Sequence, residues 1–253
     1  MFKTLIYIQQ KENCYNILVK VGGLNFYPTG VAGRIKNNSR KRYLRFMGVR
    51  LNQEGAPRDL RLKRFLNDLS VAIKFQQENS PDIVRVAEKI LEKTKKIGLS
   101  GRQLPSVDLP ALRFFKESIA IAEGNSLPIS DLSRSIAALS NQVSWYQSTK
   151  SRSLKFLNGH ANTQILGPLG LEKRDDVVIG ISLLSPNIEY PVHKHAPEEI
   201  YLVLSAGDWF QESRGWYSPG YGKLVYTPPN ISHSMRSNEK PLLTVWCLNG
   251  SKF

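Results

Sequence analysis

The chain has 253 residues, 41% of them hydrophobic, and a formal net charge of +14 at pH 7. This hydrophobic fraction is enough for a packed core and excludes wholesale disorder, and no run of 18 apolar residues predicts a membrane span. The first residues contain no cleavage site of a secretory signal, so we expect a cytoplasmic location. The two cysteines, Cys14 and Cys247, lie too far apart for a metal-binding or redox motif and fit a reducing compartment.

The positive charge is concentrated in the first part of the chain. Residues 1–102 carry 21 Lys and Arg against 8 Asp and Glu, a net of +13, whereas residues 103–253 carry 14 against 13, a net of +1. Six of the twelve residues from Arg34 to Arg45 are basic. Such an arm binds nucleic-acid phosphates in some proteins and is simply solvated in others. Because no nucleic-acid-binding motif accompanies the arm, we expect no nucleic-acid partner, although the basic charge alone does not exclude one.

The sequence pattern divides the chain into a basic N-terminal extension (1–55), a helical region (56–150) and a β-rich region (151–253). In the extension, residues 5–8 and 16–21 are typical of strands, and Met47 is an alternative natural start. In the helical region, apolar residues recur at spacings of three and four, which predicts four amphipathic helices that pack on the β-rich region. Their apolar stripes run over Leu62–Ile73, Ile83–Leu91, Leu112–Ala122 and Leu132–Tyr146.

The sequence pattern changes from helical spacing to short β-type segments after about residue 155. Four short segments, 177–184, 199–206, 223–229 and 242–248, are rich in β-branched and aromatic residues. Turn signals such as SPN, SAGD and SPGYG separate them. Short strands with Gly and Pro between them indicate an antiparallel sandwich or barrel.

Three of the four histidines fall at metal-site spacing within this β-rich region. His193, His195 and Glu199 read His-x-His-x3-Glu, and His233 follows a later turn. Residues two apart on an extended strand point to the same face, so both histidines of the first motif can face a barrel interior together with Glu199 and Tyr201. Imidazole and carboxylate ligands suit one divalent zinc, iron, manganese or nickel ion, and an open coordination position would make the site catalytic.

These residues resemble the two motifs of the cupin family. The first motif is His193, His195 and Glu199, followed by Gly207 one position later than usual. The second is Gly222, Pro228 and His233, with Asn230 where a Gly is usual; Asn also tolerates a left-handed turn. The resemblance implies an α+β protein whose mostly β C-terminal part is a cupin double-stranded β-helix barrel, preceded by an N-terminal helical region.

Two tyrosines make the resemblance specific to one group of cupins, because Tyr190 and Tyr201 do not belong to the general cupin pattern. Together with the histidines and Glu199 they look like the cupin-type dimethylsulfoniopropionate lyases, and the ILGPLG and PPNISHSMRS segments agree. The resemblance covers roughly residues 155–250. It implies that His195, Glu199 and His233 are metal ligands, that Tyr201 lies at or on the metal, and that Tyr190 and His193 line the substrate pocket.

The implied reaction is a β-elimination that yields dimethyl sulfide and acrylate. It needs a Lewis acid on the substrate carboxylate and a base for the neighbouring proton. Tyr201 is the expected base, because a nearby dication favours its phenolate, and Tyr190 is the alternative. The sulfonium favours aromatic faces, and Trp246 is the expected contact because its strand could return beside the motif.

Two alternatives stay open from the sequence. The first is another metal-dependent cupin enzyme, such as a dioxygenase, an isomerase or a different lyase, because a fold does not fix a function. The second is a module that binds a small molecule without catalysis. A homodimer is possible, and the ligand types do not select the metal.

Overall fold

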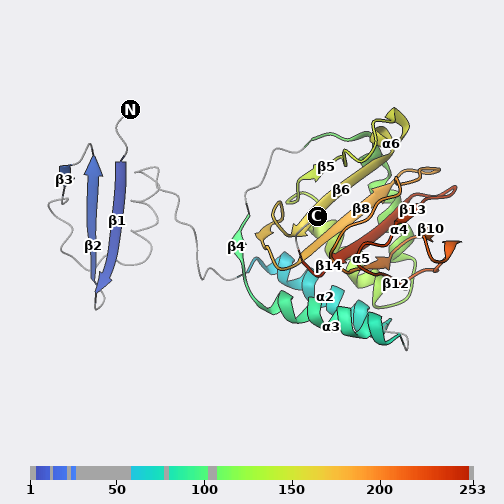
Figure 1. Cartoon of the computed structure of the whole chain (residues 1–253), viewed down its shortest axis with the longest axis horizontal. Helices are drawn as coiled ribbons and strands as arrows, with labels where there is room; N and C mark the ends of the chain where they lie inside the picture. Colours follow the sequence, from blue (N-terminus) through green and yellow to red (C-terminus); the bar gives the residue numbers. More distant parts are fainter. Residues whose placement is uncertain are drawn as a thin grey trace. The chain divides into compact units, whose positions relative to one another are not determined.

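The computed structural model describes residues 58–76, 80–101 and 107–250, and the backbone of three strands before them (Figure 1). The chain forms two compact units, Met1–Asn52 and Gln53–Phe253. In the first unit, β1 (Thr4–Lys11), β2 (Cys14–Val21) and β3 (Leu24–Phe26) form an antiparallel sheet in that order. The strands predicted at 5–8 and 16–21 are therefore confirmed. The basic arm and Met47 lie outside the described residues, so the expectations about them stay predictions.

The predicted helices of the second unit are present. They are α2 (Leu60–Phe75), α3 (Pro81–Lys95), a 3-10 turn η1 (Pro110–Phe114) that continues into α4 (Phe115–Glu123), and α5 (Ile129–Leu139). Each buries the apolar stripe that its spacing predicts; Leu62, Phe65, Leu66, Leu69 and Ile73 of α2 are examples. Among the described residues, no helix is both long and apolar enough to cross a membrane.

The prediction that the fourth helix continues to Tyr146 was wrong. The helix ends at Leu139, and Trp145 and Tyr146 form the short strand β5 (Trp145–Tyr146), which pairs with β6 (His160–Leu166). Trp145 is buried and meets Phe115 edge to face, with ring centroids 5.5 Å apart. Tertiary packing of this indole and the pairing to β6 thus replace another helical turn.

The β-rich region contains two sheets. The larger has the strand order β12-β9-β14-β8-β6-β7-β4, and the smaller has the order β11-β10-β13. Apart from the short parallel contact of β6 with β7, the pairs that hold these sheets are antiparallel. The remaining strands are β4 (Leu99–Ser100), β7 (Glu172–Lys173), β8 (Val178–Leu184), β9 (Glu199–Val203), β10 (Asp208–Gln211), β11 (Gly215–Tyr217), β12 (Leu224–Thr227), β13 (His233–Arg236) and β14 (Leu242–Leu248). The helix α6 (Leu154–Gly159) leads directly into β6.

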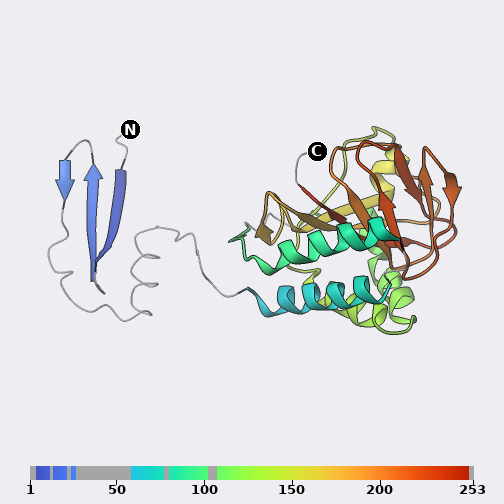
Figure 2. The same cartoon turned by 60° about the horizontal axis from the view of Figure 1, so that its bottom comes forward.

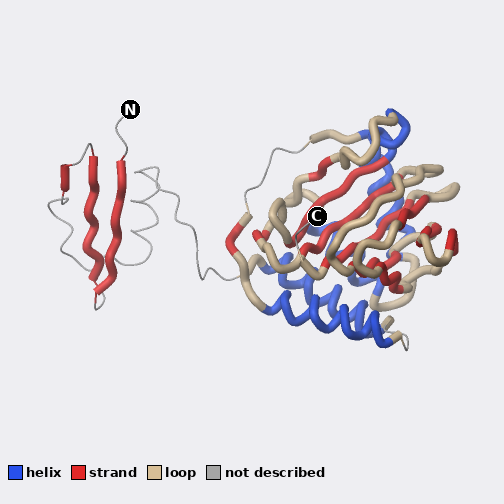
Figure 3. The backbone as a smooth tube through the Cα atoms, viewed as in Figure 1, coloured by secondary structure: helices blue, strands red, loops and turns tan. Residues whose placement is uncertain are grey.

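The central strands of the larger sheet, β6, β8, β9 and β14, are buried on both faces, and alternate residues belong to two different cores. In β9, Ile200 and Leu202 pack with the helices, whereas Tyr201 and Val203 join a second core with Trp209 of the smaller sheet. Figure 2 shows α2 and α3 side by side against the strands, and Figure 3 shows the helices gathered beside the sheet. A sheet covered on both faces needs apolar residues at nearly every position, which explains the continuous apolar runs of β8 and β14. The chain is α+β with a mostly β C-terminal part, as predicted.

Candidate metal centre and active site

The three clustered histidines come from two segments that are tied together by backbone hydrogen bonds. His193 and His233 exchange both of their N–H···O bonds, at 3.0 and 2.8 Å, as an isolated antiparallel pair. The Asn230 N–H donates to the carbonyl of His195 at 2.8 Å, and Asn230 has a φ of 59°. The left-handed turn expected at Asn230 is therefore confirmed. The histidines of the first motif lie before β9, which begins only at Glu199. A loop, held by the isolated bridge between His193 and His233, therefore brings the three histidines together.

The three imidazoles present the same ring nitrogen to one point. Their Nδ1 atoms lie beside backbone carbonyls: Pro191 at 2.9 Å for His193, Pro197 at 2.9 Å for His195 and Ile231 at 2.8 Å for His233. A carbonyl only accepts, so each Nδ1 carries a proton and each Nε2 faces inward. One ring nitrogen of each histidine lies within 4.8 Å of the others.

The carboxylate of Glu199 completes the cluster. Its Oε2 lies 3.0 Å from His195 Nε2 and 3.3 Å from His233 Nε2. Donor atoms that share a zinc-like ion lie roughly 3.0–3.4 Å apart, given metal–ligand distances of about 2.1 Å. His233 Nε2 is buried and has no hydrogen-bond partner among the described residues. A buried nitrogen lone pair that faces a carboxylate is unfavourable without a cation between them, so the residues present fit a divalent metal ion.

The pKa shifts of the cluster agree with a site that can bind a cation. Burial alone would raise the pKa of Glu199, but the hydrogen bond to His195 and the nearby imidazole of His233 lower it to about 2. Burial would lower the pKa of His195, but Glu199 raises it. Burial and the neighbouring His233 lower the pKa of His193 to about 3, which keeps that imidazole neutral. Glu199 and His195 thus each favour the charged form of the other.

His193 lies closer to the ligand cluster than the sequence-based role of pocket lining implies. Its ring centroid is 4.2 Å from that of His233 and 6.1 Å from that of His195. Tyr190 lies on its other side, with the two ring centroids 5.1 Å apart. His193 therefore stands between the cluster of His195, Glu199 and His233 on one side and Tyr190 on the other.

The two tyrosines approach the cluster with different hydroxyl partners. Tyr201 is buried, and burial followed by the charge of Glu199 raises its pKa well above the ordinary value. Its phenol hydrogen-bonds to the Glu199 carboxylate. The Tyr190 hydroxyl accepts from Asn162 Nδ2 at 3.2 Å and also bonds to Ser148. Burial raises the pKa of Tyr190 as well.

Trp246 lies directly opposite Tyr201 in the pairing of β14 with β9, so its strand does return beside the motif. On its other side Trp246 pairs with Gly180 of β8. A Cβ at Gly180 would lie 2.1 Å from Trp246 Cζ2, so the indole occupies the space that the glycine leaves. The ring is buried in the same core as Tyr190 and Tyr201.

Comparison with known proteins agrees with this geometry. The family model described as dimethylsulfoniopropionate lyase matches residues 83–244, which include all the residues of the cluster. The chain belongs to the dimethylsulfoniopropionate lyase family.

Three relatives of this lyase-family chain illustrate the similarity. The DddL protein of Cereibacter sphaeroides, named as a dimethylsulfoniopropionate lyase, is 24% identical over 134 residues; the match covers 53% of this chain and 57% of DddL, little more than half of that relative. A crystal structure from a study of the lyases RdDddP and RnDddQII has 20% identity and a TM-score of 0.59, covering 76% of this chain and 94% of that one. The lyase DddQ from Ruegeria pomeroyi DSS-3 has 19% identity and a TM-score of 0.53, covering 74% and 92%. At these identities the solved structures establish the fold, so the predicted cupin-type architecture is confirmed.

Sequence reasoning missed several polar residues around the cluster of this lyase-family chain. Asn162 donates to Tyr190 and accepts from Ser182 Oγ at 2.8 Å, and Ser148 contacts Tyr190 from the loop after β5. The charge of Lys150 interacts with Glu199, His193 and His195. No motif marks these residues. Alternation along β6 could have placed Asn162 on the inner face, but nothing local placed Lys150.

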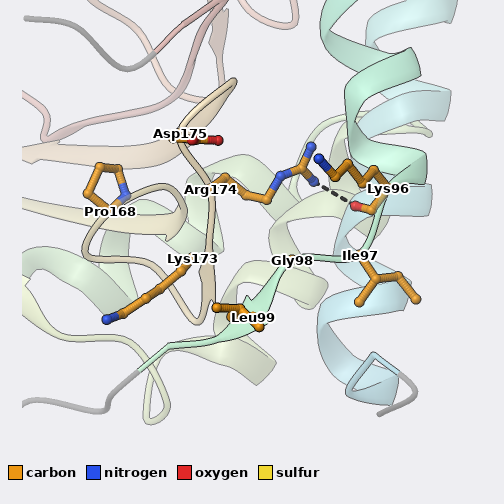
Figure 4. Close-up of a pocket in the computed structure, with 8 residues that line it drawn as sticks. All are labelled: Lys96, Ile97, Gly98, Leu99, Pro168, Lys173, Arg174 and Asp175. Carbon is orange, nitrogen blue, oxygen red and sulfur yellow. Dashed lines mark hydrogen bonds between the residues drawn. The ribbon is translucent and has the colours of Figure 1, made fainter. Parts of the chain in front are cut away.

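A cavity of about 620 Å³ is lined by residues other than the histidines, and the arginine that lines it has a structural role. Lys96, Gly98, Lys173, Arg174 and Asp175 are among its lining residues (Figure 4). Arg174 looks like an anion-binding group, but its guanidinium donates to the carbonyls of Lys93 and Lys96 at 2.7 and 2.6 Å. It therefore caps the C-terminal end of α3 and also pairs with carboxylates at 2.9 and 3.3 Å. We assign no function to this cavity.

Proposed function

We propose that this protein cleaves dimethylsulfoniopropionate into dimethyl sulfide and acrylate by a metal-dependent β-elimination. The observation that carries the proposal is the convergence of three imidazole nitrogens and the Glu199 carboxylate, beside two buried tyrosines, in a chain of this family. His195, Glu199 and His233 would hold the ion, with His193 as a further donor in reach and Tyr201 at its edge. The named activity of the relatives supports the same reaction.

A divalent ion bound there would act as a Lewis acid on the substrate carboxylate and would favour the phenolate form of Tyr201. The Tyr201 oxygen then takes the proton from the carbon next to the carboxylate. The electron pair of that C–H bond forms the C=C bond of acrylate, and the C–S bond breaks with its electrons on sulfur. Dimethyl sulfide leaves as a neutral molecule and needs no acid. The tyrosine returns its proton to water before the next turnover.

Tyr201 is favoured over Tyr190 as the base because of its surroundings. The Tyr201 phenol lies against Glu199, a proposed ligand, whereas the Tyr190 hydroxyl is occupied by Asn162 and Ser148. Tyr190 instead packs beside His193. The faces of Trp246 and Tyr190 suit a sulfonium cation, because an aromatic face attracts a positive charge. The pocket thus offers a base, an anion-binding side and an aromatic side.

The test is dimethyl sulfide release from dimethylsulfoniopropionate by the metal-loaded protein, measured in the headspace. Wild type is expected to release the sulfide, and Tyr201→Phe is expected to lower kcat by ~10²–10⁴-fold, the usual worth of a general base. Tyr190→Phe is the matched control, since it removes the other buried hydroxyl, and we expect a smaller loss. Equal loss in both variants, or full activity in Tyr201→Phe, would contradict the assignment of the base. No release from metal-loaded wild type would contradict the reaction itself.

A further inference from the structure

A row of polar residues crosses the inner face of the larger sheet. Ser182 of β8 lies opposite Asn162 of β6 on one side and opposite Thr244 of β14 on the other. Thr244 stands two residues before Trp246, which lies opposite Tyr201 of β9. Residues that are opposite in a pair, or two apart in a strand, project from the same face. Asn162 and Ser182, both buried, therefore face the same side of the sheet as Tyr201 and Trp246.

The amide of Asn162 connects this row to Tyr190. Its Oδ1 accepts from Ser182 Oγ at 2.8 Å, and its Nδ2 donates to the Tyr190 hydroxyl at 3.2 Å. All three side chains are buried, and losing one partner of a buried hydrogen bond leaves the other unsatisfied, which favours keeping the contact. The phenol oxygen is thus tied to β6 and, through Ser182, to β8.

The ring of Tyr190 is held by separate contacts at the junction of α6 and β6. Phe156 and His160 stack with their ring centroids 3.8 Å apart, and the Tyr190 ring meets both edge to face at 5.1 and 5.9 Å. His160 is itself fixed, because its Nδ1 donates to the Phe156 carbonyl at 2.6 Å and its Nε2 accepts the backbone N–H of Ser148 at 2.7 Å. The fourth histidine of the chain therefore supports Tyr190 and uses both ring nitrogens within the fold.

Tyr190 borders the histidine cluster on its remaining side, where its ring centroid lies 5.1 Å from that of His193. The aromatic contacts restrict the plane of the ring, and Asn162 restricts the position of its hydroxyl. A phenol oxygen that accepts a hydrogen bond keeps its own proton, which it can donate to an anionic oxygen of a ligand. Tyr190 is thus held beside the cluster as a potential donor.

We propose that Asn162 is a positioning residue of the active site, which acts by holding the Tyr190 hydroxyl where it donates to the carboxylate of the substrate. Ser182 orients the Asn162 amide, and Phe156 and His160 support the ring. Contacts that are already formed favour binding and turnover, because less ordering is needed when the substrate arrives. The identity of the substrate rests on the proposed function, whereas the contact between Asn162 and Tyr190 belongs to the fold.

The experiment is a double-mutant cycle on the metal-loaded protein with Asn162→Leu, Tyr190→Phe and the double variant. The ratio kcat/KM is measured from dimethyl sulfide release, and acrylate affinity is measured by calorimetry, because acrylate is not itself cleaved. Asn162→Leu is expected to lower both by ~3–10-fold, the order of one net hydrogen bond. In the Tyr190→Phe protein the same substitution should change both by less than ~2-fold, because the hydroxyl that Asn162 positions is gone.

Thr163→Val is the matched control, because it removes a hydrogen-bonding side chain from the next position of β6. The buried Thr163 hydroxyl donates to the Ser144 carbonyl at 2.9 Å, and adjacent residues of a strand project from opposite faces. Its effect should therefore be the same with and without the Tyr190 hydroxyl. Ser182→Ala is a second variant, which leaves Asn162 in place and keeps the test decisive where Asn162→Leu does not fold. We expect it to act in the same direction as Asn162→Leu, by less, and only while the Tyr190 hydroxyl is present.

Equal losses from Asn162→Leu with and without the Tyr190 hydroxyl would overturn the inference, since they would show a role in packing only. Unchanged kcat/KM and acrylate affinity in Asn162→Leu would overturn it as well. If wild type released no dimethyl sulfide but acrylate binding depended on Asn162 through Tyr190, the proposed reaction would fail while the positioning role would be supported. Sulfide release without that dependence would have the opposite meaning, and neither release nor acrylate binding by wild type would overturn both.

Discussion

Two neighbouring glutamates, Glu198 and Glu199, stand at the start of β9 and face opposite sides of the larger sheet. Glu198 accepts from Arg85 of α3 at 2.5 and 3.2 Å, from the Tyr226 hydroxyl at 3.1 Å and from Asn249 at 3.3 Å. The Glu199 carboxylate lies against His195 and His233 and hydrogen-bonds to the Tyr201 phenol. The pKa of each is lowered to about 2, mainly by Arg85 for Glu198 and by imidazoles, against burial, for Glu199.

This difference in partners distinguishes a carboxylate that stabilises the fold, Glu198, from one with a proposed role in metal binding, Glu199. The charge of Glu198 is balanced by a permanent cation that belongs to the fold, and its two oxygens are occupied. The charge of Glu199 is balanced by groups that can exchange a proton for a metal ion. Because the two residues are adjacent, Glu198 also fixes the backbone from which Glu199 projects. A depressed pKa alone would not have separated them.

The largest expected effect comes from removing the charge of Glu199. Glu199→Gln should weaken binding of a divalent metal by at least ~100-fold, because it removes a proposed ligand rather than an outer contact. Metal content after dialysis and a calorimetric titration measure this. Glu198→Gln is the matched control, since it is the same change one residue earlier, and we expect it to lower metal affinity by no more than ~10-fold. Equal metal loss in both variants would break the distinction between the two carboxylates.

A smaller effect on metal affinity is expected when the contact between Glu198 and Arg85 is removed. Arg85→Ala removes the guanidinium that holds Glu198 to α3, so the start of β9 and with it Glu199 should be less well positioned. We expect metal affinity to fall by up to ~10-fold, the lower end for groups that orient a ligand, with partial retention in Arg85→Lys. Arg134→Ala breaks the exposed ion pair with Asp131 on another helix and is the control. Wild-type metal affinity in Arg85→Ala would show that α3 does not support the site.

The smallest effect concerns stability in acid. The folded pKa of Glu198 is about 2, below its ordinary value of 4.5, so its stabilising contribution is present above about pH 4.5 and is lost as the pH falls toward 2. Arg85 is partly exposed, so solvent screening keeps this contribution to the free energy of unfolding small. Urea unfolding with a chelator present, at pH values between about 5 and 3, should show a weaker pH dependence for Glu198→Gln than for wild type. Parallel curves for the two proteins would contradict this account.

The sequence predicted most of the histidine and glutamate cluster because short-range spacing encodes it. His193, His195 and Glu199 lie within seven residues, and alternation along β9 placed Tyr201 on the inner face. Trp246 was predicted from its position on a returning strand, and its pairing with Tyr201 confirms that placement. The assignments of ligands, base and substrate contacts stay predictions that the proposed experiments test.

The surroundings of the set could not be predicted, because they depend on contacts between distant parts of the chain. Arg85 and Glu198 are 113 residues apart, and their choice of each other follows from how α3 docks on the sheet. The fourth helix was predicted to continue to Tyr146, but packing of Trp145 against Phe115 and the pairing of β5 ended it early.

The most direct test of the central claim is a chelation and restoration experiment on the purified wild-type protein with dimethylsulfoniopropionate. Dimethyl sulfide is measured before chelation, after removal of metal, and after separate addition of zinc, iron, manganese and nickel. Our account predicts release that disappears with the metal and returns with at least one of the four ions, in step with metal content. Release at the full rate from metal-free protein, or no release from protein that has bound metal, would contradict a metal-dependent lyase at His195, Glu199 and His233.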